Sequence, residues 1–408
     1  MALKGNAIIG QSGGPTAAIN ATLSGVIRGA LACSDIDHIY GAINGVEGML
    51  ADRICDLRAR CGTEEALHLL ERTPAAALGS CRLKLPDPSS DDPRWDTLFG
   101  FFEKYNIRYF FYIGGNDSMD TVAKVTRAAA SRGYEMRVAG VPKTIDNDVV
   151  GTDHTPGFGS AAKYIAVSMQ EILRDCAVYT VPAVTIVEIM GRDAGWLTAA
   201  AALTRGTGME ADLICLPERA FDHDAFFARL RAALADHPNV VVAVSEGLRC
   251  PDGSYLGAST QSGAADVFGH QYLAGTGKAL ERMIKAEIGC KVRAVELNIL
   301  QRCASHVASA VDLAESVMVG RAAVEAAAAG QSGMMMTFRR AEEAPYRVTV
   351  ESGNIAEIAN RVRTVPDAFI TADGMQITDA CVEYLRPLIL GEVDQEYRDG
   401  LPLHFSLK

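Results

Sequence analysis

The chain has 408 residues, more than one domain usually holds, and it combines 49% hydrophobic with 22% charged residues. These values indicate a globular protein of about two domains and exclude a disordered or fibrous chain. The formal net charge of −11 argues against a broad nucleic-acid-binding surface. No apolar stretch reaches the roughly 18 residues of a membrane span, so we expect neither a nucleic-acid nor a membrane partner.

The ten cysteines are scattered, with no Cys-x-x-Cys pair and no Cys/His grouping at the spacing of a zinc site. Such cysteines are ordinarily reduced thiols in a cytoplasm. The first ten residues carry one charge and an apolar run that is too short for a signal peptide. We therefore expect a cytoplasmic protein.

Short apolar runs that end in glycine recur along the chain and are typical of buried parallel strands. They span residues 7–10, 109–115, 138–141, 184–191 and 240–247, and stretches with a helical pattern span 118–133, 160–174, 195–204 and 223–235. This alternation predicts an α/β fold with doubly wound sheets, in which ligands bind beyond the carboxyl ends of the strands. Residues 330–408 resemble a late strand followed by an appended segment.

The first strand leads through a glycine-rich turn, residues 10–16, into a helix. Backbone amides at such a helix start can cradle phosphate oxygens, and Gly13 and Gly14 allow the backbone to approach them closely. The turn matches neither Gly-x-Gly-x-x-Gly nor the Walker pattern. Taken alone, it is equally well explained as a plain structural turn.

The second strand ends in Gly114-Gly115-Asn116-Asp117-Ser118 and again leads into a helix. An acidic side chain at this turn repels phosphate unless a metal ion or a lysine lies between them. A helix cap formed by Asp117 or Ser118 is the alternative.

The third strand delivers Pro142-Lys143-Thr144-Ile145-Asp146-Asn147-Asp148 to the same edge. Two carboxylates two residues apart in an extended loop project to one side, where one can take a hydroxyl proton and the other hold a metal ion or an arginine. Lys143 supplies positive charge for a phosphoryl group in transfer. A solvated acidic turn is the alternative.

Together with Ile-Met-Gly-Arg-Asp-Ala-Gly-Trp at residues 189–196, these motifs resemble in order and spacing those of the phosphofructokinases. The resemblance extends from the first glycine loop to about Arg302. It implies phosphorylation of fructose 6-phosphate at its 1-hydroxyl with Mg²⁺, and a homodimer or homotetramer with active sites completed across subunits. It also implies two Rossmann-like domains with the active site between them: a donor-phosphate domain (1–150), a sugar-phosphate domain (151–303), and a return to the first domain with a C-terminal segment (304–408).

The resemblance also assigns roles to matching positions. Asp146 corresponds to the general base, Thr144 and Asp148 flank the reacting groups, and Arg192 stabilises the transferring phosphoryl or the substrate. A simple pairing of Arg192 with Asp193 is the alternative. The substrate-binding positions that it implies are Gly13, Gly14, Arg82, Ile145, Met190, Gly191, Glu246, Arg293 and Arg302, and the metal-binding positions are Asn116 and Asp117. Of these, Arg293 and Arg302 match arginines that grip the sugar phosphate.

Three positions depart from the better-known family pattern. Asn116 replaces an aspartate and is a weaker metal ligand. Ile299 stands where a histidine or tyrosine contacts substrate, and Ala183 where ATP-using members carry an arginine that reaches a neighbouring site.

The donor is indicated by two side chains. ATP-using relatives carry Gly-Gly-Asp-Gly-Ser and Pro-Gly-Thr-Ile-Asp-Asn-Asp, whereas this chain has Asp117 and Lys143 at the corresponding glycines. The Asp117 side chain fills the space that the α-phosphate of a nucleotide needs, and its negative charge repels that phosphate. Lys143 can neutralise the charge of pyrophosphate. Both changes, with a similar Asp-Val-Phe-Gly-His stretch at residues 266–270, resemble the pyrophosphate-dependent branch. An ATP-dependent phosphofructokinase and a non-catalytic sugar-phosphate sensor are the alternatives, although a sensor is expected to lose Asp146.

Overall fold

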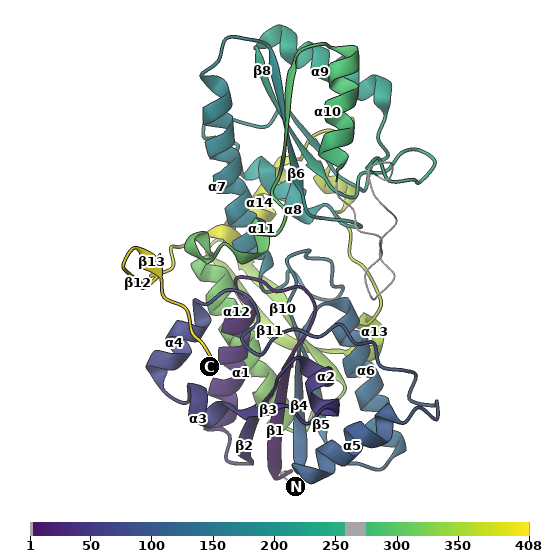
Figure 1. Cartoon of the computed structure of the whole chain (residues 1–408), viewed down its shortest axis with the longest axis vertical. Coiled ribbons are helices and arrows are strands. Elements are labelled where there is room, and N and C mark those ends of the chain that lie inside the picture. The colour runs from purple at the N-terminus through teal and green to yellow at the C-terminus, as the bar shows by residue number, and fades with distance from the viewer. Residues whose placement is uncertain (1–2, 258–274, 408) are drawn as a thin grey trace.

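The computed structural model describes residues 3–257 and 275–407, and its elements form two lobes, the larger one below the smaller one in Figure 1. The stretch at 266–270 lies outside these ranges. Strands alternate with helices, and both main sheets have parallel cores, so the predicted α/β fold class is confirmed. In the described ranges, no helix combines the length and the apolarity that crossing a membrane requires.

The larger lobe is built on a seven-stranded sheet in the order β11-β10-β5-β4-β1-β2-β3. The five inner strands run parallel, and β3 and β11 pair antiparallel at the two edges. The strands are β1 Gly5–Gln11, β2 Ile36–Ala42, β3 Ile54–Asp56, β4 Ile107–Gly114, β5 Arg137–Pro142, β10 Met334–Glu343 and β11 Tyr346–Asn354. Residues late in the chain therefore complete the sheet that its first residues begin.

Helices cover both faces of this sheet, which explains why its central strands are apolar along their whole length. On β4, Phe111 packs with α1, α3, α4 and α12, whereas Phe110 and Tyr112 pack with α2, α5 and α6 on the other face. The helices of this lobe are α1 Ile19–Ala32, α2 Gly45–Leu50, α3 Leu57–Cys61, α4 Glu64–Glu71, α5 Arg94–Lys104, α6 Asn116–Ser131, α12 Ala310–Ala328 and α13 Ile355–Ile358.

The smaller lobe has a four-stranded parallel sheet in the order β7-β8-β6-β9. Its strands are β6 Ala183–Ile189, β7 Leu213–Cys215, β8 Asn239–Ser245 and β9 Lys291–Glu296. The remaining α-helices are α7 Phe158–Ala177, α8 Trp196–Ala199, α9 His223–Asp236, α10 Thr276–Glu287, α11 Leu300–Cys303 and α14 Asp379–Leu385. Short 3-10 turns (η1 Ala200–Thr204, η3 Ser305–Val307, η4 Asp367–Phe369 and η5 Arg386–Ile389) and a hairpin (β12 Tyr397–Arg398, β13 Leu401–Pro402) complete the described elements.

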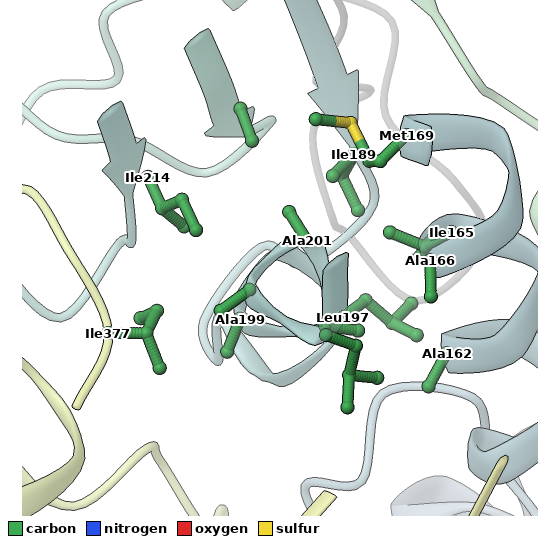
Figure 2. Close-up of a cluster of buried hydrophobic side chains, with 14 of the residues drawn as sticks. Ala162, Ile165, Ala166, Met169, Ile189, Leu197, Ala199, Ala201, Ile214 and Ile377 are labelled. Carbon is green, nitrogen blue, oxygen red and sulfur yellow. The ribbon is translucent and has the colours of Figure 1, made fainter. Parts of the chain in front are cut away.

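One core of the smaller lobe lies directly behind the end of β6. Figure 2 shows Ile165 and Met169 of α7 turned toward Ile189, the last residue of β6, with Leu197 of α8 beside them. All four side chains are at most 1% exposed. This packing fixes the point at which the chain leaves β6 and enters residues 190–195.

Two glycines allow α1 and α12 to cross closely over the larger sheet. A Cβ added at Gly25 would lie 2.2 Å from the carbonyl oxygen of Val317, and one at Gly320 would lie 2.4 Å from that of Thr22. The obstructing atoms belong to the helix backbone and cannot rotate away.

Replacing Gly25 by alanine should therefore destabilise the protein by roughly 1–3 kcal/mol, the usual cost of overpacking. Thermal unfolding at fixed pH measures the change. Gly100 in α5 is the matched control, because a Cβ there meets no described atom within 4 Å outside its own stretch of helix. Gly100→Ala should raise stability by about 0.5–1 kcal/mol. Similar melting temperatures for the two variants would contradict the close crossing.

Candidate active site

A cleft of about 770 Å³ lies between the two lobes. Its walls come from the loops that follow β1, β4 and β5 in the larger lobe and β6, β8 and β9 in the smaller one. Parallel strands end at one edge of a sheet, so these loops converge there. The predicted site residues that line it are Gly13, Gly14, Arg82, Asn116, Asp117, Lys143, Thr144, Ile145, Asp146, Asp148, Met190, Arg192, Glu246 and Arg302.

Asp146 lies in the loop after β5 and is held by its neighbour Thr144. The Thr144 hydroxyl donates to Asp146 Oδ2 at 3.1 Å and accepts from the Asp146 amide at 3.1 Å. Burial raises the pKa of Asp146, although Thr144 and the positive charges of Lys143 and Arg192 favour its ionised form. A carboxylate with a raised pKa is a stronger proton acceptor, as a general base requires.

Lys143 is buried beneath the first glycine loop, with 1% of its surface exposed. Its ammonium donates to the carbonyls of Ser12 at 3.0 Å and Gly14 at 2.6 Å. Burial lowers the pKa of Lys143 to about 8, while the charge of Asp146 opposes this shift. An ammonium has three protons, so one remains for an anion in the cleft. Lys143 thus joins the loop after β1 to the loop after β5.

Asp148 and Asn116 together offer oxygen atoms to a cation. Asn116 Nδ2 donates to Asp148 Oδ2 at 2.9 Å, and Asn116 Oδ1 is buried without a hydrogen-bond partner within the described ranges. Burial, followed by the charge of Asp146, raises the pKa of Asp148 to about 7. A cation beside these groups would give the Asn116 oxygen a partner and would weaken the repulsion between the carboxylates of Asp146 and Asp148.

These oxygens fit a hard cation such as Mg²⁺, which takes one or two carboxylates and completes its shell with water and substrate phosphate. Among the described residues, no group of three or more His, Cys, Asp or Glu forms a ready-made metal cage. Asp117 lies in the first turn of α6 and is exposed on the cleft wall. Any metal here would therefore depend on the substrate for several ligands.

The positive charges of the cleft come from both lobes. Arg192 Nε is buried and has no hydrogen-bond partner within the described part of the chain. Asp193 is instead bonded to Arg249 at 2.8 Å, so the simple Arg192–Asp193 pair is not formed. Arg302 Nη1 approaches the first loop closely, 3.5 Å from where a Cβ on Gly14 would lie. An anion in the cleft can therefore reach cations from opposite walls.

Glu246 follows β8 and faces the loop after β6. Its Oε1 accepts from the amide of Gly191 at 3.4 Å, and burial raises the pKa of Glu246 to about 7. Gly191 itself lies between the lining residues Met190 and Arg192 without lining the cleft. A carboxyl group at this depth suits hydrogen bonding to sugar hydroxyls.

Besides Gly191, Arg293 is the other predicted site residue that does not line the cleft. It lies midway along β9 and faces a shallow depression beside α7, lined also by Glu171, Asp175 and Thr185. The cleft forms further on, at the carboxyl end of β9. Ile299 does line the cleft and is 53% exposed, whereas Ala183 begins β6 at the far end of that strand.

Several lining residues carried no recognisable sequence signal. Glu188, Glu296, Asn298 and Gln301 belong to the smaller lobe, and Asn360 and Val362 belong to the segment after α13. Glu188 accepts from the amide of Gly277 at 2.7 Å near the start of α10, which explains its burial. The position of residues 360–362 shows that the C-terminal segment takes part in the cleft wall.

The raised pKa of Asp148 predicts a pH-dependent gain in stability for Asp148→Asn. Folding disfavours the charged carboxylate, so wild-type stability falls as pH rises from the ordinary value of 3.8 to about 7 and then levels off. The ligand-free variant lacks this penalty and keeps an oxygen that can accept from Asn116. It should exceed wild type by on the order of 1–3 kcal/mol at pH 8, and by less at pH 5. Equal differences at the two pH values, measured by thermal unfolding, would refute this.

The comparisons with known proteins agree with the resemblance drawn from the motifs. Residues 6–327 match the phosphofructokinase family. The pyrophosphate–fructose 6-phosphate 1-phosphotransferase of Halomonas elongata is 42% identical over 97% of this chain and 94% of that protein, and its namesake in Methylococcus capsulatus is 40% identical over 98% and 96%. The solved structure of the pyrophosphate-dependent phosphofructokinase from Nitrosospira multiformis matches with a TM-score of 0.88 at 38% identity, covering 97% of this chain and 95% of that one. This chain therefore belongs to the phosphofructokinase family.

Proposed function

We propose that this protein transfers a phosphoryl group from pyrophosphate to the 1-hydroxyl of fructose 6-phosphate, giving fructose 1,6-bisphosphate and orthophosphate, and catalyses the reverse reaction. The observation that carries the proposal is the Lys143 ammonium, buried under the first glycine loop in the same cleft as Asp146. ATP-using relatives have a glycine at this position. The names of the two relatives described above support the same donor.

Asp146 is the proposed base. With its pKa raised by burial, it takes the proton of the sugar 1-hydroxyl as that oxygen attacks the terminal phosphorus of pyrophosphate. Lys143, Arg82 and the backbone of the first glycine loop bind the pyrophosphate, and orthophosphate leaves. Arg192 supplies to the phosphoryl in transfer its Nε–H, which is without a partner in residues 3–257 and 275–407.

Asp148 and Asn116, with Asp117 at the rim, are the residues proposed to hold Mg²⁺. When bound, the ion would neutralise phosphate charge in the transition state. Asn116 Oδ1, which has no hydrogen-bond partner among the described residues, supports this assignment. Among the side chains themselves, Thr144 orients Asp146 and Asn116 orients Asp148.

The sugar phosphate is proposed to lie against the smaller lobe. Glu246 accepts hydrogen bonds from sugar hydroxyls, residues 190–191 and Ile145 contact the sugar, and Arg302 binds its phosphate. Arg293 cannot serve the cleft of its own chain from its place on β9. Its proposed role therefore requires a homodimer or homotetramer in which it reaches the site of a second copy.

The two sheets support the proposed division of labour, with residues 1–150 binding the donor, 151–303 binding the sugar phosphate, and 304–408 returning to the larger lobe and ending in a C-terminal segment. Helix α14 of that segment packs in the smaller lobe. We also propose a cytoplasmic location, consistent with the ten cysteines, all of which are free thiols.

A two-donor assay tests the proposed function. Purified protein with fructose 6-phosphate and Mg²⁺ should form fructose 1,6-bisphosphate with pyrophosphate and show at most about 1% of that rate with ATP, because Asp117 obstructs the nucleotide. Asp146→Ala is the control for contaminating enzymes and should lower kcat by at least about 10³-fold. Turnover with ATP alone would establish the ATP-dependent alternative, and binding without turnover would establish the sensor.

The two donor-selecting side chains can be tested directly. Asp117→Gly combined with Lys143→Gly should reduce kcat/KM for pyrophosphate at least about 100-fold, because a cation at the leaving group is lost. Asp117→Asn removes the charge but keeps the volume, so it should leave ATP unused. An unchanged pyrophosphate rate in the double variant would contradict the role given to Lys143, and ATP use by Asp117→Asn would show that charge alone selects the donor.

A further inference from the structure

The Tyr384 hydroxyl, on α14 near the C-terminus, makes a complete set of hydrogen bonds within the chain. It donates to the carbonyl of Asp153 at 2.6 Å and accepts from Arg363 Nη2 at 2.8 Å and from Asn147 Nδ2 at 3.2 Å. A phenol has one proton to donate and two lone pairs that accept. Three segments that are distant in sequence therefore meet at one oxygen atom.

Asn147 lies between the two carboxylates of the loop after β5. It is fully buried and has a left-handed backbone with φ of +53°. Its Nδ2 donates to Tyr384, and its Oδ1 accepts from the Thr155 amide at 3.1 Å. Few non-glycine residues adopt this backbone conformation, and the surrounding contacts must hold it in place. The directions of Asp146 and Asp148 consequently depend on how Asn147 is held.

Arg363 joins the same loop to the smaller lobe. Its amide donates to the carbonyl of Asp148 at 2.7 Å, and its guanidinium donates to the carbonyls of Thr152 and Asp153. The guanidinium carbon lies 4.3 Å from the ring centre of Trp196, whose Nε1 donates to the Arg363 carbonyl at 3.1 Å. Trp196 begins α8, four residues after Arg192, so one residue connects the segments that carry the base and the arginine.

We propose that Tyr384 and Arg363 are positioning residues: they hold Asn147 and Trp196 so that Asp146 and Arg192 keep their relative positions across the cleft. Neither Tyr384 nor Arg363 lines the cleft, and both lie beyond residue 327, where the family match ends. The inference rests on the proposed phosphoryl transfer, but not on which donor is used. A displacement of about 1 Å in such a site can cost 100-fold in rate.

Tyr384→Phe is the variant that tests this proposal, because it removes one oxygen and keeps the ring that packs on Trp196. We expect kcat to fall at least about tenfold while the KM values change less than about twofold, the pattern of an interaction needed only for the chemical step. Tyr134→Phe is the matched control: the Tyr134 hydroxyl shares its one proton between the carbonyls of Phe102 and Ile107, in the larger lobe and away from the cleft. It should lose comparable stability and keep wild-type kcat.

The proposal fails if Tyr384→Phe keeps kcat within twofold of wild type at a temperature where both proteins are folded. It also fails if Tyr134→Phe lowers kcat as much as Tyr384→Phe does. A double-mutant cycle tests the route through Asn147, using Asn147→Gly because glycine accepts the positive φ. Tyr384→Phe should cost little further activity in that background. If the two substitutions lower kcat independently, so that their factors multiply in the double variant, Tyr384 does not act through Asn147.

A failure of the proposed positioning role can be told apart from a failure of the proposed function. If wild type turns over ATP and not pyrophosphate, the same comparison is made with ATP. If neither donor reacts, the proposed function fails, and amide hydrogen exchange of residues 144–149 decides the inference. Exchange there should accelerate in Tyr384→Phe and stay at the wild-type rate in Tyr134→Phe; unchanged exchange in both would overturn it.

Discussion

The cleft depends on one buried cation. Lys143 donates to two carbonyls of the first glycine loop and belongs to the loop that carries Asp146. A buried ammonium is tolerated only where oxygen atoms and negative charge replace its lost water. This requirement ties the loops after β1 and β5 into one unit, so the first glycine loop and the proposed base, Asp146, cannot shift independently.

The charges of the cleft oppose the charge of the molecule. A chain with a formal net charge of −11 gathers Lys143, Arg82, Arg192 and Arg302 around one cavity, which gives a polyanion a favourable place to bind. Burial in the walls of this cavity raises the pKa of carboxyl groups there, including Asp148 and Glu246. These buried carboxyl groups thus lower the stability of the ligand-free fold, and the apolar cores behind the strands offset that loss.

The fold was predictable where one local pattern decides the structure. Residues 109–115 are apolar because helices cover both faces of the sheet, and glycine turns mark where strands end at the cleft. Sequence failed where the decisive contact is between distant segments. Nothing near Tyr384 in the sequence points to its contact with Asn147 in the loop after β5, and nothing near Asn360 points to the cleft that Asn360 lines. The predicted contact of Arg293 with the sugar phosphate stays a prediction, because Arg293 lies midway along β9 and faces a depression beside α7.

The return of the chain to its first sheet has a consequence for synthesis. Strand β5 gains its outer neighbour from β10, and α12 packs on α1 beside α3 and α4. Both β10 and α12 follow the four strands of the smaller lobe in the sequence. A chain growing on the ribosome therefore exposes an unpaired strand edge and the part of α1 that α12 covers until α12 and β10 have been made. During that interval the nascent chain is open to association with other chains, and it is there that a chaperone has most to protect.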